Sequence, residues 1–336
     1  MSGETAAVPV SLVAARRHPR GPASRTEGPA DVLELRVEHD DDQPGVSLGQ
    51  ARVLLVGVAR LMQAAAMAAM GPAPRFAGRR PDAVKAFVEQ DIRFAHAEVG
   101  SPLLAVHTRL DEDPAPVMAG GRAVPVSWAT GMVRLAPFQR RVGTTLAGAL
   151  AEVSEAIRDH RAARRATPAA PDGQAAEAAP SPLVLRGVSV DLCDALLAMV
   201  AAPRVDLLEL AFYWAPRPGL DSPAVLRVAL RRDDTDALLQ LRDTLLGLPD
   251  QARTAVYGQV TRLDRGDADD GGLVTIHGVV GRSTQRTVQI SLSGGEYDAA
   301  IRAYRTRAPV IATGRLRRIG GIHVLTGQFT VTGAAS

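Results

Sequence analysis

The sequence predicts an α+β protein built from a mixed α/β N-terminal body and a five-stranded C-terminal β-barrel. Three observations support this prediction. The chain has 336 residues, which is room for two domains, and 46% of them are apolar, enough to bury a core in each. The first 250 residues alternate strand-like and helix-like apolar patterns. The last 84 residues follow the order β-β-β-α-β-β.

The composition of residues 1–30 predicts a disordered basic tail. Their arginines follow a short apolar stretch rather than precede it, which is the wrong order for a signal peptide. A strand is expected at 32–40, followed by a helix from Ser47 to Met70 that Gly71 ends. This helix is long and apolar, but Arg60 near its middle would cost at least ~2.5 kcal/mol in a bilayer. A buried core helix, and no membrane partner, is therefore predicted.

The rest of the body is predicted in two parts, 31–165 and 183–250, joined by a mobile Pro/Ala-rich linker at 166–182. Apolar periodicity predicts the helices 81–97, 133–165, 188–202 and 234–248, and a short strand around 124–128. Four strands are expected to form one mixed sheet with long helices on one or both faces, namely 32–38, 102–109, 205–214 and 224–231.

Residues 251–333 contain the clearest pattern in the chain. Strands are predicted at 254–263, 273–281, 286–292, 309–318 and 323–332, with a helix at 295–307. Glycines stand where such strands would bend, at Gly258, Gly278 and Gly314. This quarter of the chain resembles an OB-fold, a five-stranded barrel with a helix between its third and fourth strands. The resemblance predicts a buried set, Val260, Ile276, Val288, Ile290, Leu316 and Phe329, and an exposed set, Arg302, Arg305, Arg315 and Arg317.

No motif supports a catalytic site. The chain has one lysine, Lys85, followed by alanine, which excludes a P-loop. Residues 45–49 match the G-x-S-x-G nucleophile pattern, but Ser47-x-x-Gln50 is also a helix capping box, which is the favoured interpretation. His96 and Glu98 match the H-x-E of zinc deaminases but lack the cysteine pair that completes such a site.

No metal site or cofactor is predicted either. The single cysteine, Cys193, excludes disulfides and all-cysteine metal sites, and its helical spacing with leucines indicates a buried apolar role. Acidic clusters at 38–42 and 111–113 each follow a predicted strand, where carboxylates can bind Mg²⁺ or Ca²⁺. Because EF-hand spacing is missing from both, solvated turns are favoured.

The positive charge of the chain is concentrated in the barrel. The net charge is +3, yet residues 253–336 alone carry +5. A nucleic-acid site there would use Tyr257 and His277 as the only candidate stacking residues, with phosphates bound by Arg302, Arg305, Arg315 and Arg317. An acidic loop at 264–270 and the lack of an aromatic platform weigh against this interpretation.

The function that the sequence favours is a non-catalytic binding or assembly subunit acting with protein partners. Nucleic-acid binding through the barrel is the alternative, and a hydrolase whose site has no local motif is the second alternative. The near-absence of lysine and the complete absence of asparagine indicate a high-GC bacterial genome, so part of the arginine excess reflects codon bias. A cytoplasmic location is expected.

Overall fold

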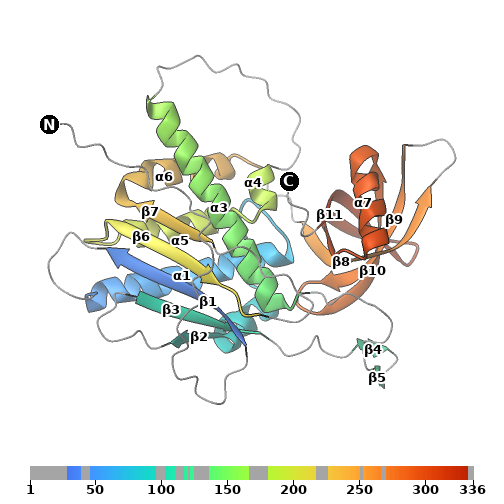
Figure 1. Ribbon diagram of the computed structural model, residues 1–336, viewed down its shortest axis with the longest axis horizontal. Helices are drawn as coiled ribbons and strands as arrows, with labels where there is room; N and C mark the ends of the chain where they lie inside the picture. The colour runs from blue at the N-terminus through green and yellow to red at the C-terminus, as the bar shows by residue number, and fades with distance from the viewer. Residues whose placement is uncertain are drawn as a thin grey trace.

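The computed structural model describes residues 29–38, 46–95, 103–110, 117–119, 122–124, 136–165, 181–216, 226–249, 253–265 and 270–331. These residues form an α+β structure, as predicted, with a five-stranded sheet in the N-terminal body and a second five-stranded sheet at the C-terminus. Figure 1 shows the two parts side by side, with one end of the long helix α3 directed at the C-terminal part. The predicted tail at 1–30 lies almost entirely outside the described residues.

The sheet of the body has the order β2-β3-β1-β6-β7, and every pairing in it is antiparallel. Its strands are β1 Ala30–Glu38, β2 Ile92–Ala95, β3 Leu103–Arg109, β6 Leu207–Tyr213 and β7 Arg227–Arg231. Central strand β1 alternates strictly, burying Leu33, Leu35 and Val37 on one face while Arg36 and Glu38 on the other are exposed. Such alternation is typical of an antiparallel sheet with one face on the core.

The prediction of a four-stranded mixed sheet is wrong, because residues predicted to end a helix form a fifth strand. Helix α2, Asp82–Ala86, continues as one wider π-turn, Phe87–Asp91, and strand β2 then begins at Ile92. Ile92 pairs with Thr108 and Phe94 with Val106 of β3. The apolar spacing fitted a helix through residue 97, but pairing with the otherwise open edge of β3 overrides that local preference.

Four helices cover the core face of this sheet. They are α1 Leu48–Met70, α3 Phe138–Arg165, α5 Val190–Val200 and α6 Thr235–Leu246, and their buried side chains share one cluster with those of the strands. Helix α1 is the one described helix long and apolar enough to cross a membrane. Its buried side chains, among them Leu54 and Leu61, pack in this core, as in a soluble protein.

One further prediction in the body needs correction. The predicted linker ends earlier than 182, because Pro182 begins the short helix α4, Pro182–Leu185; residues 166–180 lie outside the described part of the chain. A short hairpin is formed by β4, Val117–Ala119, and β5, Arg122–Val124. The strand expected around 124–128 begins at the last residue of β5, and its other residues lie outside the described part of the chain.

The capping role predicted for Ser47 is confirmed. Its Oγ accepts a hydrogen bond from the backbone N–H of Gln50 at 3.3 Å, and Gln50 Oε1 accepts one from the N–H of Ser47 at 2.9 Å. Gln50 also donates from Nε2 to the carbonyl of Pro203 at 2.6 Å, which ties the start of α1 to the end of α5. Ser47 is therefore committed to the helix terminus by a reciprocal pair of hydrogen bonds.

Replacing Ser47 with alanine is expected to lower the free energy of unfolding by about 0.5–2 kcal/mol, the usual cost of losing such a cap. Ser47→Asp should keep most of that stability, because aspartate also caps helices and its charge suits the N-terminal end of the helix dipole. Urea unfolding of the three proteins gives the comparison. Labelling of Ser47 by a fluorophosphonate probe would contradict a purely structural role.

The C-terminal sheet closes into a barrel in the order β10-β12-β11-β8-β9. Its strands are β8 Thr254–Arg265, β9 Gly271–Val280, β10 Thr284–Ser293, β11 Val310–Ile319 and β12 Ile322–Val331. Helix α7, Gly294–Thr306, covers one end of the barrel with the buried side chains of Tyr297, Ala300 and Ala303 (Figure 1). Two glycine pairs, Gly258 with Gly278 and Gly314 with Gly327, lie where a Cβ would collide with the neighbouring strand's backbone.

The predicted barrel core is confirmed at five of six positions, Val260, Ile276, Val288, Ile290 and Phe329. Leu316 is only half-buried. The described pairing of β11 with β8 ends at Gly314, so among the described residues Leu316 has a strand partner, β12, on one side only. The four arginines predicted to be exposed, Arg302, Arg305, Arg315 and Arg317, are exposed.

Candidate functional site

The four arginines that the sequence grouped into one phosphate-binding surface do not form one. Arg302 and Arg305 lie on α7, at the barrel end where β10 finishes and β11 begins. Arg315 and Arg317 lie toward the other end of β11, beside its turn into β12, and a strand rises ~3.3 Å per residue. The two pairs therefore occupy opposite ends of the barrel.

Of the two predicted stacking residues, Tyr257 is not an open platform for a base. Tyr257, on the outward face of β8, is covered by the guanidinium of Arg141 from the body, whose Cζ lies 4.4 Å from the ring centroid. His277, on the outward face of β9, is half-buried, and its Nδ1 lies 3.3 Å from Thr287 Oγ1. One of the two is thus occupied by an intramolecular contact.

Arg141 is the centre of the contact between the body and the barrel. Its Nη2 donates to the carbonyls of Gly281 at 2.8 Å and Arg282 at 2.9 Å, both in the β9–β10 turn. Its guanidinium also lies against the Phe138 ring, at 5.3 Å from the centroid, as well as against Tyr257. The side chain comes from the first turns of α3 and is almost completely buried. One arginine therefore connects three separate pieces of chain.

Burial dominates the electrostatics of this contact. It lowers the pKa of Arg141 to about 10, against a raising effect of Tyr257, and Arg141 stays protonated at neutral pH. Burial likewise raises the pKa of Tyr257, with Arg141 acting in the opposite direction, so the phenol stays neutral. The charge is therefore met by carbonyl oxygens and aromatic faces, both of which stabilise a guanidinium.

A second polar contact joins the same two parts. Asp91, the last residue of the π-turn, pairs through Oδ2 with Nη2 of Arg282 at 2.9 Å. The same oxygen accepts a hydrogen bond from Gln139 Nε2 at 3.1 Å. Arg282 thus offers its backbone carbonyl to Arg141 and its side chain to Asp91. We call Asp91, Phe138, Arg141, Tyr257 and Arg282 together the junction.

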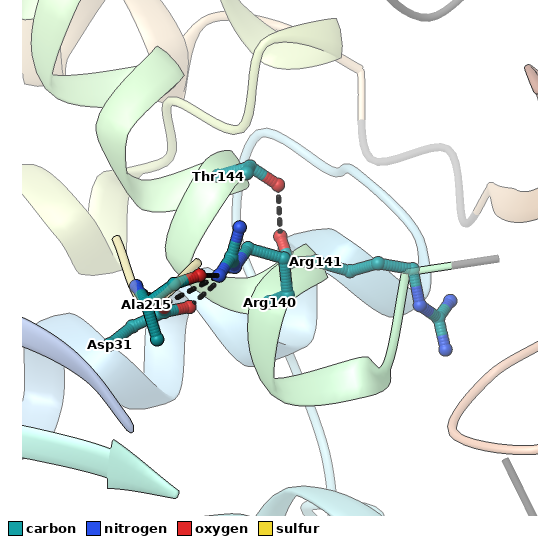
Figure 2. A network of polar contacts seen from close by, with 5 residues as sticks. All are labelled: Asp31, Arg140, Arg141, Thr144 and Ala215. Atoms are coloured by element: carbon teal, nitrogen blue, oxygen red, sulfur yellow. Dashed lines mark hydrogen bonds and ion pairs between the residues drawn. The ribbon is translucent and has the colours of Figure 1, made fainter. Parts of the chain in front are cut away.

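The residue before Arg141 makes an equally buried contact inside the body (Figure 2). Arg140 forms a bidentate pair with Asp31, with Nε 2.7 Å from Oδ2 and Nη2 2.8 Å from Oδ1. Its Nη2 also donates to the carbonyl of Ala215, whose N–H donates to Asp31. Figure 2 shows Arg140 and Arg141 extending in opposite directions from α3, one toward the sheet and one away from it.

The arrangement holds surfaces together and presents no catalytic constellation. Within the described residues no group of three or more histidine, cysteine or acidic side chains is placed to hold a metal ion. Cys193 is fully buried, and burial raises the pKa of its thiol to about 12, so it is not a reactive thiolate. Of the two acidic clusters, only Glu38 lies in the described part of the chain, and His96 and Glu98 lie outside it.

Comparisons with known proteins identify no relative. No protein-family model, no curated protein and no solved structure matches this chain.

Sequence reasoning missed every residue of the junction except Tyr257. A usable pattern was present for Arg141, because it lies three residues after Phe138 on the apolar face of a helix that also buries Val142 and Leu146. Asp31 was similarly placed on the apolar face of β1. A charged residue on such a face predicts a buried partner. The pattern does not show which partner, because the partner of each residue lies more than a hundred positions away: Arg140 for Asp31, and Tyr257 and the β9–β10 turn for Arg141.

Proposed function

We propose that this protein is a non-catalytic binding or assembly subunit that acts with a protein partner. The observation that carries this proposal is the occupation of Tyr257 by Arg141, since it removes the better of the two base-stacking candidates from the barrel surface. The large apolar side chains that the barrel exposes are Ile319 at 59%, Ile322 at 48% and, on α7, Tyr304 at 46%. The two isoleucines are neighbours across the β11–β12 turn, whereas Tyr304 is a lone aromatic residue on the helix and forms no row of stacking platforms. Adjacent aliphatic side chains without such a row favour a protein over a nucleic acid as the partner.

We further propose that the barrel belongs to the OB-fold superfamily. Its strand order, its closure and the helix between its third and fourth strands support this assignment. OB-fold barrels commonly bind nucleic acids, so the assignment keeps that alternative in view. A cytoplasmic location, as expected for a bacterial protein whose most apolar helix packs in its core, completes the proposal.

One observation favours nucleic-acid binding as a second candidate. Among the described residues, Arg302, Arg305, Arg315 and Arg317 are exposed and no carboxylate forms an ion pair with them. Arginines of this kind attract phosphates. Their position at opposite ends of the barrel weighs against this candidate, because one single strand would need to contact both ends.

The two candidates separate in one experiment on the full chain. The tagged protein is used to capture partners from a nuclease-treated lysate of its native host, and its binding to oligothymidylate is measured over a range of salt concentrations. We expect a protein partner that is retained after nuclease treatment and at high salt. We expect no measurable oligothymidylate affinity.

The opposite outcome is equally specific. If four arginines bound a single strand, log K would fall against log salt with a slope of about −3, from −0.7 per phosphate. That slope, together with capture that nuclease abolishes, would contradict the protein-partner proposal and support the nucleic-acid candidate.

A further inference from the structure

The β11–β12 turn presents an apolar surface flanked by positive charge. Ile319 pairs directly with Ile322 across the turn, Arg317 with Val324, and Arg315 with Thr326. Because side chains alternate along a strand, Arg315, Arg317 and Ile319 share the outward face of β11, and Ile322 lies beside Ile319. Arg318 is exposed on the other face. We call Arg315, Arg317, Arg318, Ile319 and Ile322 the hairpin tip.

The two isoleucines are not needed to make the turn. Gly320 and Gly321 both have positive φ, 57° and 86°, and such a pair suffices for a two-residue hairpin turn. A single cross-strand aliphatic pair adds only modestly to the stability of a hairpin. Ile319 and Ile322 are both about half exposed. Their apolar surface is in contact with water, and a bound partner would bury it.

The hairpin tip also carries positive charge that no described carboxylate neutralises. No ion pair forms between a described carboxylate and Arg315, Arg317 or Arg318. Arg315, Arg317 and Ile319 are spaced two residues apart on one face of β11. An extended segment lying along this face would place alternate side chains beside these three residues.

We propose that the hairpin tip is the docking site for an extended acidic segment of a partner protein, which lies along the outward face of β11. Alternate residues of that segment are acidic where they meet Arg315 and Arg317, and aliphatic where they meet Ile319. This inference rests on the proposed function, of which it specifies the surface and the partner chemistry. Charge complementarity selects an acidic segment, and no aromatic side chain on the tip offers a surface for base stacking.

The test selects peptides from a random phage-displayed library on the full-length protein. The doubly substituted protein R315E/R317E serves as the counter-target that removes unspecific binders. We expect enriched peptides with alternating acidic residues and an aliphatic residue. In fluorescence polarisation we expect about tenfold weaker binding to R315E/R317E, and about tenfold weaker binding to Ile319→Asp.

A matched control makes the result specific to the tip. R302E/R305E makes the same change of charge at the opposite end of the barrel and should leave peptide affinity unchanged. All these positions are exposed, so each variant should fold with an unchanged thermal transition.

Three outcomes would overturn the inference. These are enrichment of no peptide, enrichment of peptides without acidic residues, and equal binding of the selected peptide by wild type and R315E/R317E. If a host protein is still captured by R315E/R317E in the lysate experiment, the proposed function stands and the docking site lies elsewhere. If oligothymidylate binds and is lost in R315E/R317E, the proposed function and the inference both fail.

Discussion

Replacing Arg140 with methionine is expected to lower the free energy of unfolding by about 3–5 kcal/mol. The substitution leaves Asp31 in the core of the body without its bidentate partner, and a buried carboxylate that loses its counter-ion is one of the costliest single defects in a protein. The carbonyl of Ala215 loses its donor at the same time. Urea unfolding followed by circular dichroism measures the change.

Two controls separate burial from charge. Arg164 pairs with Asp236 at 3.4 Å, but both side chains are mostly exposed, so Arg164→Met should change stability by less than about 0.5 kcal/mol. In the double variant D31L/R140M the uncompensated charge is absent, and part of the lost stability should return. A double variant less stable than R140M alone would contradict this account of the pair.

Replacing Arg141 with methionine is expected to loosen the barrel from the body, at a cost of about 2–4 kcal/mol. Two carbonyls lose a charged donor, each such hydrogen bond contributing about 1.5–3 kcal/mol. The stacking on Tyr257 adds about 0.5–2 kcal/mol. The gain from no longer burying a charge offsets part of this loss. Calorimetry should show the barrel unfolding in a separate transition of its own.

A matched control is Arg262→Met, which removes an exposed arginine of the barrel that pairs only locally with Asp264. This variant should unfold as wild type does. If R141M also unfolds in an unchanged transition, Arg141 contributes nothing to the coupling, and the pair of Asp91 with Arg282 or apolar contacts must hold the barrel in place.

The sequence predicted what depends on local periodicity. The barrel strands, α7 and the Ser47 cap follow from alternation, helical spacing and a capping pair, all within a few residues of one another. Strand β2 could not be predicted in this way, because Ile92 and Phe94 fit a helical pattern until β3 is available as a partner. The prediction that Leu316 is buried failed for the same reason, because the point at which β8 begins decides how much of β11 it pairs with.

The candidate site was harder to predict than the fold because it depends on contacts between distant segments. The net charge of the barrel correctly indicated exposed arginines, but a net charge does not show where on the barrel they lie. Arg302 and Arg305 lie at one end of the barrel, and Arg315 and Arg317 at the other. Tyr257 was correctly singled out as an outward-facing aromatic residue, yet its partner is an arginine of the same chain. Nothing in the sequence around Tyr257 indicates that α3 reaches it.

The position of β1 in the sheet has a consequence for folding. β1 is the first described strand but the central strand of the body, and its partner β6 is synthesised more than half a chain length later. Until β6 emerges from the ribosome, β1 can pair with β3 on one side only. The apolar face formed by Leu33, Leu35 and Val37 is not fully covered until α5 and α6 have also been synthesised. Sheets closed by such distant segments form slowly and expose aggregation-prone surface meanwhile. The nascent chain is therefore most vulnerable to misassembly before its barrel has been made.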